Sequence, residues 1–163
     1  MAGPNNIPQP LSRRRPPPTG DEEATTQLHL GEYTDVPCLS VSEAHAVLQK
    51  VIQARTTPDQ NGRLPPPMPN SDVFNNTKRY LDEFARFRGE QAVQQVESVS
   101  QKLVVGYGGG NDGITGFERA QLGTLCCDTV DEARVLIPSL EKKVSDDELQ
   151  QVLDDISKLR DFS

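Results

Sequence analysis

Proline divides this chain into two parts with different folding prospects. The chain has thirteen prolines; twelve precede Asn70, and the only later one is Pro138. Proline lacks a backbone N–H and clashes with the preceding helical turn, so clustered prolines oppose helix formation in the front part. The back part is almost free of this restriction. We therefore expect the folded body to be mainly α-helical and to occupy residues 71–163.

The large apolar residues follow the same division. Leu, Ile, Val and Phe account for 27 of the 92 residues from Asp72 onward, but for only 2 of the first 27. A segment with so little apolar surface cannot offset the entropy lost on ordering. We expect residues 1–24, which also carry three consecutive arginines at 13–15, to form a disordered tail.

Charge and cysteine content narrow the function classes. Lys and Arg number 17 against 24 Asp and Glu, giving a net charge of −7. An acidic chain is a poor unaided binder of nucleic acid, because that affinity comes largely from cations placed on phosphates. No apolar run approaches the ~20 residues of a membrane span, and the N-terminus lacks the apolar region of a signal peptide. Three cysteines, an odd number, favour a reducing intracellular compartment, and with two histidines they make no recognisable zinc pattern.

Residues 25–39 resemble a strand. Leu28 and Leu30 alternate with polar neighbours, and Tyr33 and Val36 add β-favouring side chains. One strand cannot make a sheet, and nothing downstream in the chain looks like its partner. The segment is therefore predicted to be an arm that either lies over the helical body or adds to the sheet edge of another chain. We favour the second.

A helix is predicted over residues 40–55. Ser40 and Glu43 form a capping box at its start. One face carries the apolar residues Ala44, Val47, Leu48, Val51 and Ile52. This face can pack on the chain's own helices or on a partner, and the spacing does not decide between them.

Residues 56–70 then form a linker whose three consecutive prolines favour polyproline geometry; we interpret it as a spacer rather than an SH3 ligand.

Two helices are expected next, over 72–88 and 90–105, with Gly89 ending the first. The first carries Phe84 and Phe87, which we expect in the core. The second is rich in valine, yet its apolar spacing favours a helix over a strand.

Between this second helix and the next one, Gly108, Gly110 and Gly113 match G-x-G-x-x-G. The strand–turn–helix context of a dinucleotide site is missing, so we expect no nucleotide there.

Three further helices are each predicted to begin with a capping box. The pairs are Thr115 with Glu118, Thr129 with Glu132, and Ser145 with Glu148. The last helix has one apolar stripe, made of Leu149, Val152, Leu153, Ile156 and Leu159. Its acidic first turn and basic last turn complement the helix dipole, so these charges need no metal to explain them.

No catalytic group emerges from this pattern. His29 and His45 have no serine and acid partners, and Cys126 and Cys127 read as small buried residues. Asp154 and Asp155 are adjacent, so on a helix they point about 100° apart and cannot act together on one substrate. We expect no catalytic residue, cofactor site or metal site, and hence no enzyme.

Two stretches closely resemble the fourth subunit of eukaryotic RNA polymerase II. They are NTKRYLDEFARFRGEQAV (76–93) and FERAQLGTLCCDTVDEARVLIPSLEKKVSDDELQQVLDDI (117–156). The most specific part is the spacing of Phe117, Glu118, Ala120, Leu122 and Leu125. The segments QLHLGEYT and LSVSEAHAVL resemble the family's first strand and first helix more weakly. The glycine-rich loop is longer than that family's usual turn.

The resemblance implies a non-catalytic stalk subunit. Its fold would be a helical bundle of the helicase/RNase D C-terminal type, with an N-terminal β-like arm that adds to a partner. Members pair with the seventh polymerase subunit beside the RNA exit path, and support initiation, nascent-RNA handling and the docking of transcription and RNA-processing factors. They contact nascent RNA mainly through the partner. They are mainly nuclear, and some move to the cytoplasm.

The arm and the first helix supply the candidate interface with the seventh subunit. The candidate residues are Leu28, Leu30, Tyr33, Val36, Val47, Leu48 and Val51. The alternative function is a free-standing helical module that binds nucleic acid. A basic cluster supports this alternative; it consists of Lys78, Arg79, Arg86 and Arg88. However, residues 72–163 hold 11 basic against 17 acidic side chains, which argues against strong unaided binding of nucleic acid.

Overall fold

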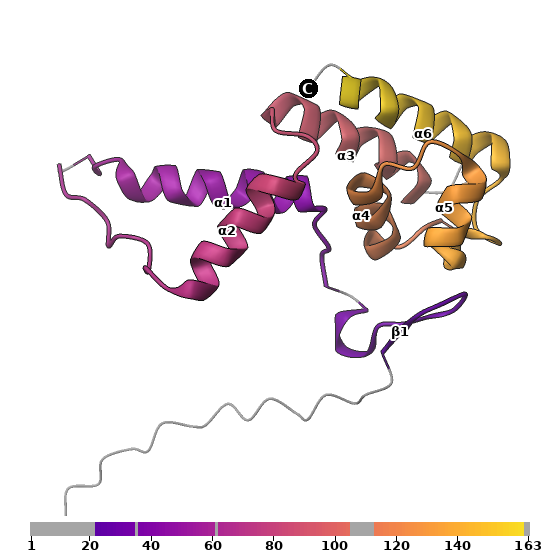
Figure 1. Cartoon of the computed structure of the whole chain (residues 1–163), viewed down its shortest axis with the longest axis horizontal. Helices are drawn as coiled ribbons and strands as arrows, with labels where there is room; N and C mark the ends of the chain where they lie inside the picture. Colours follow the sequence, from indigo (N-terminus) through magenta and orange to yellow (C-terminus); the bar gives the residue numbers. More distant parts are fainter. Residues whose placement is uncertain (1–21, 35, 61, 105–112, 162–163) are drawn as a thin grey trace, which may run out of the picture.

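The computed structural model describes residues 22–34, 36–60, 62–104 and 113–161. Within them the chain is mainly helical, with a very small sheet near the N-terminus (Figure 1). Helices α1 and α2 cross on one side of the molecule, and α3 to α6 form a bundle on the other. The predicted fold class is therefore confirmed. None of the helices described is long and apolar enough to cross a membrane.

The N-terminal arm is a hairpin rather than a lone strand. Strand β2 (Leu28–His29) pairs antiparallel with β1 (Glu23–Ala24), with Ala24 opposite Leu28. A single turn, η1 (Gly31–Tyr33), follows. The prediction of an unpaired strand missed β1 because Glu23 and Ala24 have low β propensity and stand just upstream, inside the segment assigned to the tail. A hairpin whose strands have only two residues each contributes little stability of its own.

Helix α1 (Val41–Thr56) begins at the predicted capping box. The Ser40 side chain accepts from the Glu43 N–H, and the Glu43 carboxylate accepts from the Ser40 N–H at 2.5 Å. Helix α1 lies against α2, α3 and α4. Its apolar face is divided: Leu48 and Ile52 are half-buried, whereas Val47 and Val51 are exposed.

Helix α2 (Asp72–Phe84) ends earlier than predicted. Ala85 adopts an extended conformation there, and the chain turns through residues 85–89 before α3 (Glu90–Val104). Gly89 is not the stop of α2; its carbonyl instead accepts from Val93 in the first turn of α3. Because the helix ends at Phe84, Phe87 leaves the helical spacing and is fully buried, while Phe84 is exposed. The expectation that both rings are core was wrong for Phe84.

The core lies among α3, α4 (Gly116–Leu125), α5 (Val130–Leu136), the turn η2 (Pro138–Leu140) and α6 (Asp146–Asp161). The stripe predicted on α6 is confirmed: Leu149, Val152, Leu153 and Ile156 are buried and Leu159 packs against them. Phe87 joins the same cluster from the turn after α2. The hydrophobic effect of this cluster is the main source of stability of the bundle.

The last three helices begin at the predicted capping residues, and one of the three predicted capping boxes is incomplete. Thr115 and Glu118 form a full capping box on α4, and Ser145 and Glu148 bond reciprocally before α6. At α5 the Thr129 hydroxyl caps the helix, but the Glu132 carboxylate accepts from the N–H of Asp128 rather than from that of Thr129. That box is therefore only half formed.

Candidate partner-docking surface

Exposed apolar side chains gather where α1 begins. Leu39 is 53% exposed and Val47 is 50% exposed. A groove between α1 and α3 is lined by four apolar residues, Leu39, Ala46, Val47 and Val93, and by five polar ones, Glu43, Lys50, Glu90, Gln94 and Glu97. Lys50 and Glu90 are paired there at 2.6 Å. Apolar side chains next to charged ones are common in protein interfaces.

A second groove continues from the other side of Leu39. It is lined by Cys38, Leu39 and, on α4, by Phe117, Ala120 and Leu125. Since both grooves share Leu39, they form one apolar surface across α1, α3 and α4. We call these two grooves together the Leu39 surface. A large apolar residue would normally be buried at this position, because the residue before an N-cap tends to pack against the fourth residue of the helix.

The candidate residues of the arm are less uniform. Tyr33 and Val36 are about half exposed, at 52% and 48%, whereas Leu28 and Leu30 are partly covered. On α1, Val47 and Val51 are exposed and Leu48 is half-buried. The structure thus leaves Tyr33, Val36, Val47 and Val51 open to a partner and turns the three leucines partly inward.

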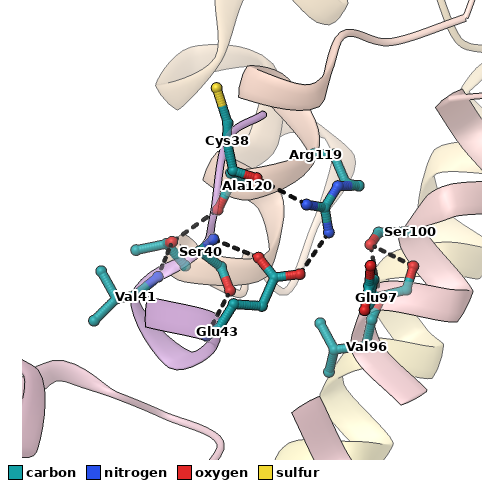
Figure 2. Close-up of polar contacts among 10 residues, drawn as sticks. Cys38, Ser40, Val41, Glu43, Val96, Glu97, Ser100, Arg119 and Ala120 are labelled. Carbon is teal, nitrogen blue, oxygen red and sulfur yellow. Dashed lines mark hydrogen bonds and ion pairs between the residues drawn. The ribbon is translucent and has the colours of Figure 1, made fainter. Parts of the chain in front are cut away.

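A buried polar network fixes the start of α1 beside α4 (Figure 2). The Arg119 guanidinium donates to Glu43 Oε1 at 2.7 Å and to the backbone carbonyl of Cys38 at 2.9 Å. The two charged side chains are only 11% and 9% exposed. Arg119 therefore connects helix α4 both to the first turn of α1 and to the segment that leads into the arm.

Two further hydrogen bonds hold the same turn. The Val41 N–H donates to the hydroxyl of Thr124 on α4 at 3.2 Å, and the Phe87 N–H donates to the hydroxyl of Ser42 at 3.1 Å. The Thr124 hydroxyl satisfies a backbone N–H that the start of a helix leaves without a partner, and the Ser42 hydroxyl satisfies a backbone N–H in the turn after α2. The start of α1 is thus bonded both to α4 and to the turn after α2, which orients the Leu39 surface.

The carboxylate of Glu43 is held in its charged form. Burial alone would raise its pKa, but hydrogen bonds from Arg119 and from the Ser40 N–H, with the charge of Arg119, outweigh burial and lower the pKa below its usual value. A charge so placed is stable only while its partners remain.

A second buried carboxylate lies in the first turn of α4, directly before Arg119. Glu118 is fully buried, and it accepts from Ser139 Oγ and from Lys143 Nζ, the latter at 2.8 Å to both oxygens. It also caps α4 through Thr115. Glu118 therefore links α4 to the segment between α5 and α6. Every buried side-chain polar atom in the part of the chain that the structure describes has such a partner.

Two of the three cysteines show structural rather than reactive features. Cys126 and Cys127 are buried in the core. Burial raises the pKa of the Cys126 thiol to about 11 and raises that of Cys127. Among the described residues, no group of three or more His, Cys, Asp and Glu could hold a metal ion. Of the glycine pattern, Gly108 and Gly110 lie outside the described residues.

The basic residues of α2 and of the turn after it mostly contact other groups of the chain. Lys78 pairs with Asp82 at 2.5 Å, Arg79 donates to Asn76, and Arg88 donates to the carbonyl of Asp82. Asp82 also contacts His45 of α1 at 3.1 Å, which joins the two helices. Three of the four basic residues named for a free-standing nucleic-acid module thus have partners within the chain, and Arg86 is exposed.

The sequence reasoning missed Leu39 and its neighbours on α4. Phe117 and Leu125 carried the family resemblance, but their exposure could not be read from helix periodicity. Leu39 could have been noticed, since it is a large apolar residue directly before an N-cap serine. The pairing of Arg119 with Glu43 could not be predicted from the sequence, because only tertiary packing brings the two residues together.

Comparison with known proteins supplies the family. The model of the family RNA polymerase Rpb4 matches residues 38–160. A fission yeast relative, DNA-directed RNA polymerase II subunit rpb4 of Schizosaccharomyces pombe, is 41% identical over 142 residues, covering 86% of this chain and 94% of its own. The Saccharomyces cerevisiae subunit RPB4 is 43% identical over 90 residues, covering 55% of this chain and 37% of its own.

A plant relative extends the comparison over most of the chain. DNA-directed RNA polymerase II subunit 4 of Arabidopsis thaliana is 29% identical over 146 residues, covering 87% of this chain and 96% of its own. The matched region includes α1 to α6, the Leu39 surface and the Arg119 network. The resemblance found in the sequence is thereby confirmed, and the chain belongs to the RNA polymerase Rpb4 family.

Proposed function

We propose that this chain is the non-catalytic fourth subunit of RNA polymerase II and that it forms a stalk with the seventh subunit near the RNA exit path. In that position it would support initiation, nascent-RNA handling and the docking of transcription and RNA-processing factors. Nascent RNA would be contacted mainly through the partner. The chain would act in the nucleus, with a further pool in the cytoplasm.

The observation that carries the proposal is an exposed apolar surface inside the region that matches the family. Leu39 and Val47 are each at least half exposed, and the start of α1 between them is hydrogen-bonded to α4. Tyr33 and Val36 extend the exposed apolar area into the arm. Contiguous apolar patches of this kind mark interaction sites in proteins that fold alone. Main-chain pairing through the arm would add to side-chain docking on α1.

The test is binding to the purified seventh subunit. We expect a one-to-one complex on size-exclusion chromatography, with new hydrogen-exchange protection over residues 25–52. Replacing Val47 and Val51 together by Asp would desolvate two charges at the interface and weaken binding about thirtyfold or more. Val135→Asp is the matched control, since Val135 is 77% exposed on α5, away from this surface.

Two results would overturn the interface. One is unchanged protection over residues 25–52 on mixing. The other is equal affinity for the double variant and the Val135→Asp control. If the interface fails but the chain still co-purifies with the polymerase core, membership of the polymerase stands and only the pairing surface is wrong.

A further inference from the structure

The sequence alone favours a spacer between α1 and α2, but the exposure of this segment in the structure supports a second role as a ligand. Its sequence from residue 63 to 69 is Arg-Leu-Pro-Pro-Pro-Met-Pro. Residues 64, 65, 66 and 68 each precede a proline, which restricts them to extended or polyproline II conformations. In the structure, residues 63–70 belong to no helix or strand. A preformed extended segment loses little conformational entropy when a partner binds it.

The exposure of the segment repeats every third residue. Pro65 and Met68 are half-buried, whereas Arg63, Pro66 and Pro69 are exposed, as are Leu64 and Pro67. A polyproline II helix has three residues per turn, so residues three apart share a face. The half-burial of Pro65 and Met68, three residues apart, therefore matches a polyproline II helix with one face turned toward its own protein. Arg63, Pro66 and Pro69 lie together on a face turned to solvent.

Both ends of the segment are anchored. At the N-terminal end, Asp59 and Arg63 close a turn: the Asp59 N–H donates to the Arg63 carbonyl at 2.9 Å, and the Arg63 N–H donates to Asp59 Oδ1 at 2.8 Å. At the C-terminal end, Asn75 donates to the side chain of Asn70 at 3.1 Å, and Ser71 caps α2. The prolines therefore lie between a hydrogen-bonded turn of the connection and the capped start of α2.

We propose that residues 63–69 are a docking site for a protein domain of the SH3 type. Pro66 and Pro69 would fill neighbouring aromatic-lined pockets, since two prolines separated by two residues fit such grooves. Arg63, one turn before Pro66 on the same face, would meet a carboxylate at the end of the groove. Charge selects this kind of partner over an uncharged proline groove, because a basic residue at the same three-residue spacing matches an acidic rim.

This site is separate from the surface proposed for the seventh subunit. The proline segment and the Leu39 surface share no residue. The chain could therefore carry an additional partner while paired, and the failure of either proposal leaves the other standing.

The test uses the full chain and a purified SH3 domain that recognises Arg-x-x-Pro-x-x-Pro peptides. Met68 is the only methionine after Met1, so methyl-¹³C-methionine labelling gives a probe inside the segment. We expect the Met68 signal to shift in a saturable way as the SH3 domain is added. By calorimetry, Arg63→Glu and Pro66→Ala should each weaken binding about tenfold.

The matched control is Pro67→Ala, which removes the same type of side chain from another exposed face. It should leave the affinity within about a factor of two, which is less than about 0.5 kcal/mol. All of these side chains are exposed, so the variants should fold, and each should bind the seventh subunit as the wild type does. The proposal is overturned if Met68 does not shift at saturating SH3 domain, or if Pro67→Ala weakens binding as much as Pro66→Ala. A WW domain that shifts Met68 where the SH3 domain does not would also reject it.

Discussion

Removing the guanidinium of Arg119 tests whether the start of α1 depends on the buried ion pair. Arg119→Met keeps an unbranched side chain of similar length and deletes both hydrogen bonds, to Glu43 and to the Cys38 carbonyl. Glu43 is left as a buried carboxylate without its counter-charge, at 9% exposure. The perturbation therefore isolates the charge from the packing of the side chain.

The size of the effect follows from the remaining partners. Breaking a buried ion pair by removing one member costs about 3–5 kcal/mol. Glu43 keeps its bond from the Ser40 N–H at 2.5 Å, so we expect the lower end of that range, about 3 kcal/mol. For a domain of this size, such a loss lowers the melting temperature by roughly 6–12 °C.

The assay is urea unfolding followed by circular dichroism at pH 7. The double variant Arg119→Met/Glu43→Gln should recover part of the loss, because it no longer buries an unpaired charge. Arg79→Met is the control, since Arg79 is exposed on α2; it should change the free energy of unfolding by less than about 0.5 kcal/mol. A loss below about 1 kcal/mol for Arg119→Met, or a double variant as unstable as the single one, would refute the reasoning.

Three further predictions follow from burial and charge. Because the pKa of Glu43 is lowered in the folded state, its contribution to stability is present above the unfolded-state pKa and is lost as the pH falls. The free energy of unfolding should therefore fall more steeply from about pH 5 to pH 3 in wild type than in Glu43→Gln. Parallel curves in acid unfolding would contradict this. Burial raises the pKa of Cys126 to about 11. A thiol reagent at pH 8 should therefore modify Cys38 first and reach Cys126 and Cys127 only after denaturation. Labelling of Cys126 in the native protein at the rate of Cys38 would contradict the burial of Cys126. Leu149→Ala empties a fully buried site and should cost about 2–5 kcal/mol in chemical denaturation, whereas Val73→Ala, at 77% exposure, should cost almost nothing; equal costs would contradict the packing described.

Features that depend on neighbours in the sequence were predicted well. The capping boxes at Ser40 and Thr115, and the apolar stripe of α6, were recognised because their residues are three or four positions apart. The helical fold and the family could be predicted for the same reason, since the motifs that carry them are local.

Features that depend on tertiary packing were not predicted. The early end of α2 at Phe84 moved Phe87 into the core and Phe84 to the surface, because the turn at Ala85 overrides the helical spacing. The pairing of Arg119 with Glu43 spans 76 positions and has no sequence signature. The division of the α1 stripe, with Val47 exposed and Leu48 half-buried, likewise depends on which helices lie beside it. Exposure, and hence the candidate docking surface, could be found only in the fold.

The anchoring of α1 through its first turn has a consequence for how the chain can change over evolutionary time. Arg119, Thr124 and Phe87 hold that turn without any help from the covalent connection to α2. For the stability of the helices, the connection therefore only has to span the distance between them, because loop-closure entropy changes slowly with loop length. Insertions between residues 57 and 71 should be tolerated easily, and a chain cut there should still reassemble from its two fragments. New binding sequences can be gained or lost in this connection without disturbing the helices on either side.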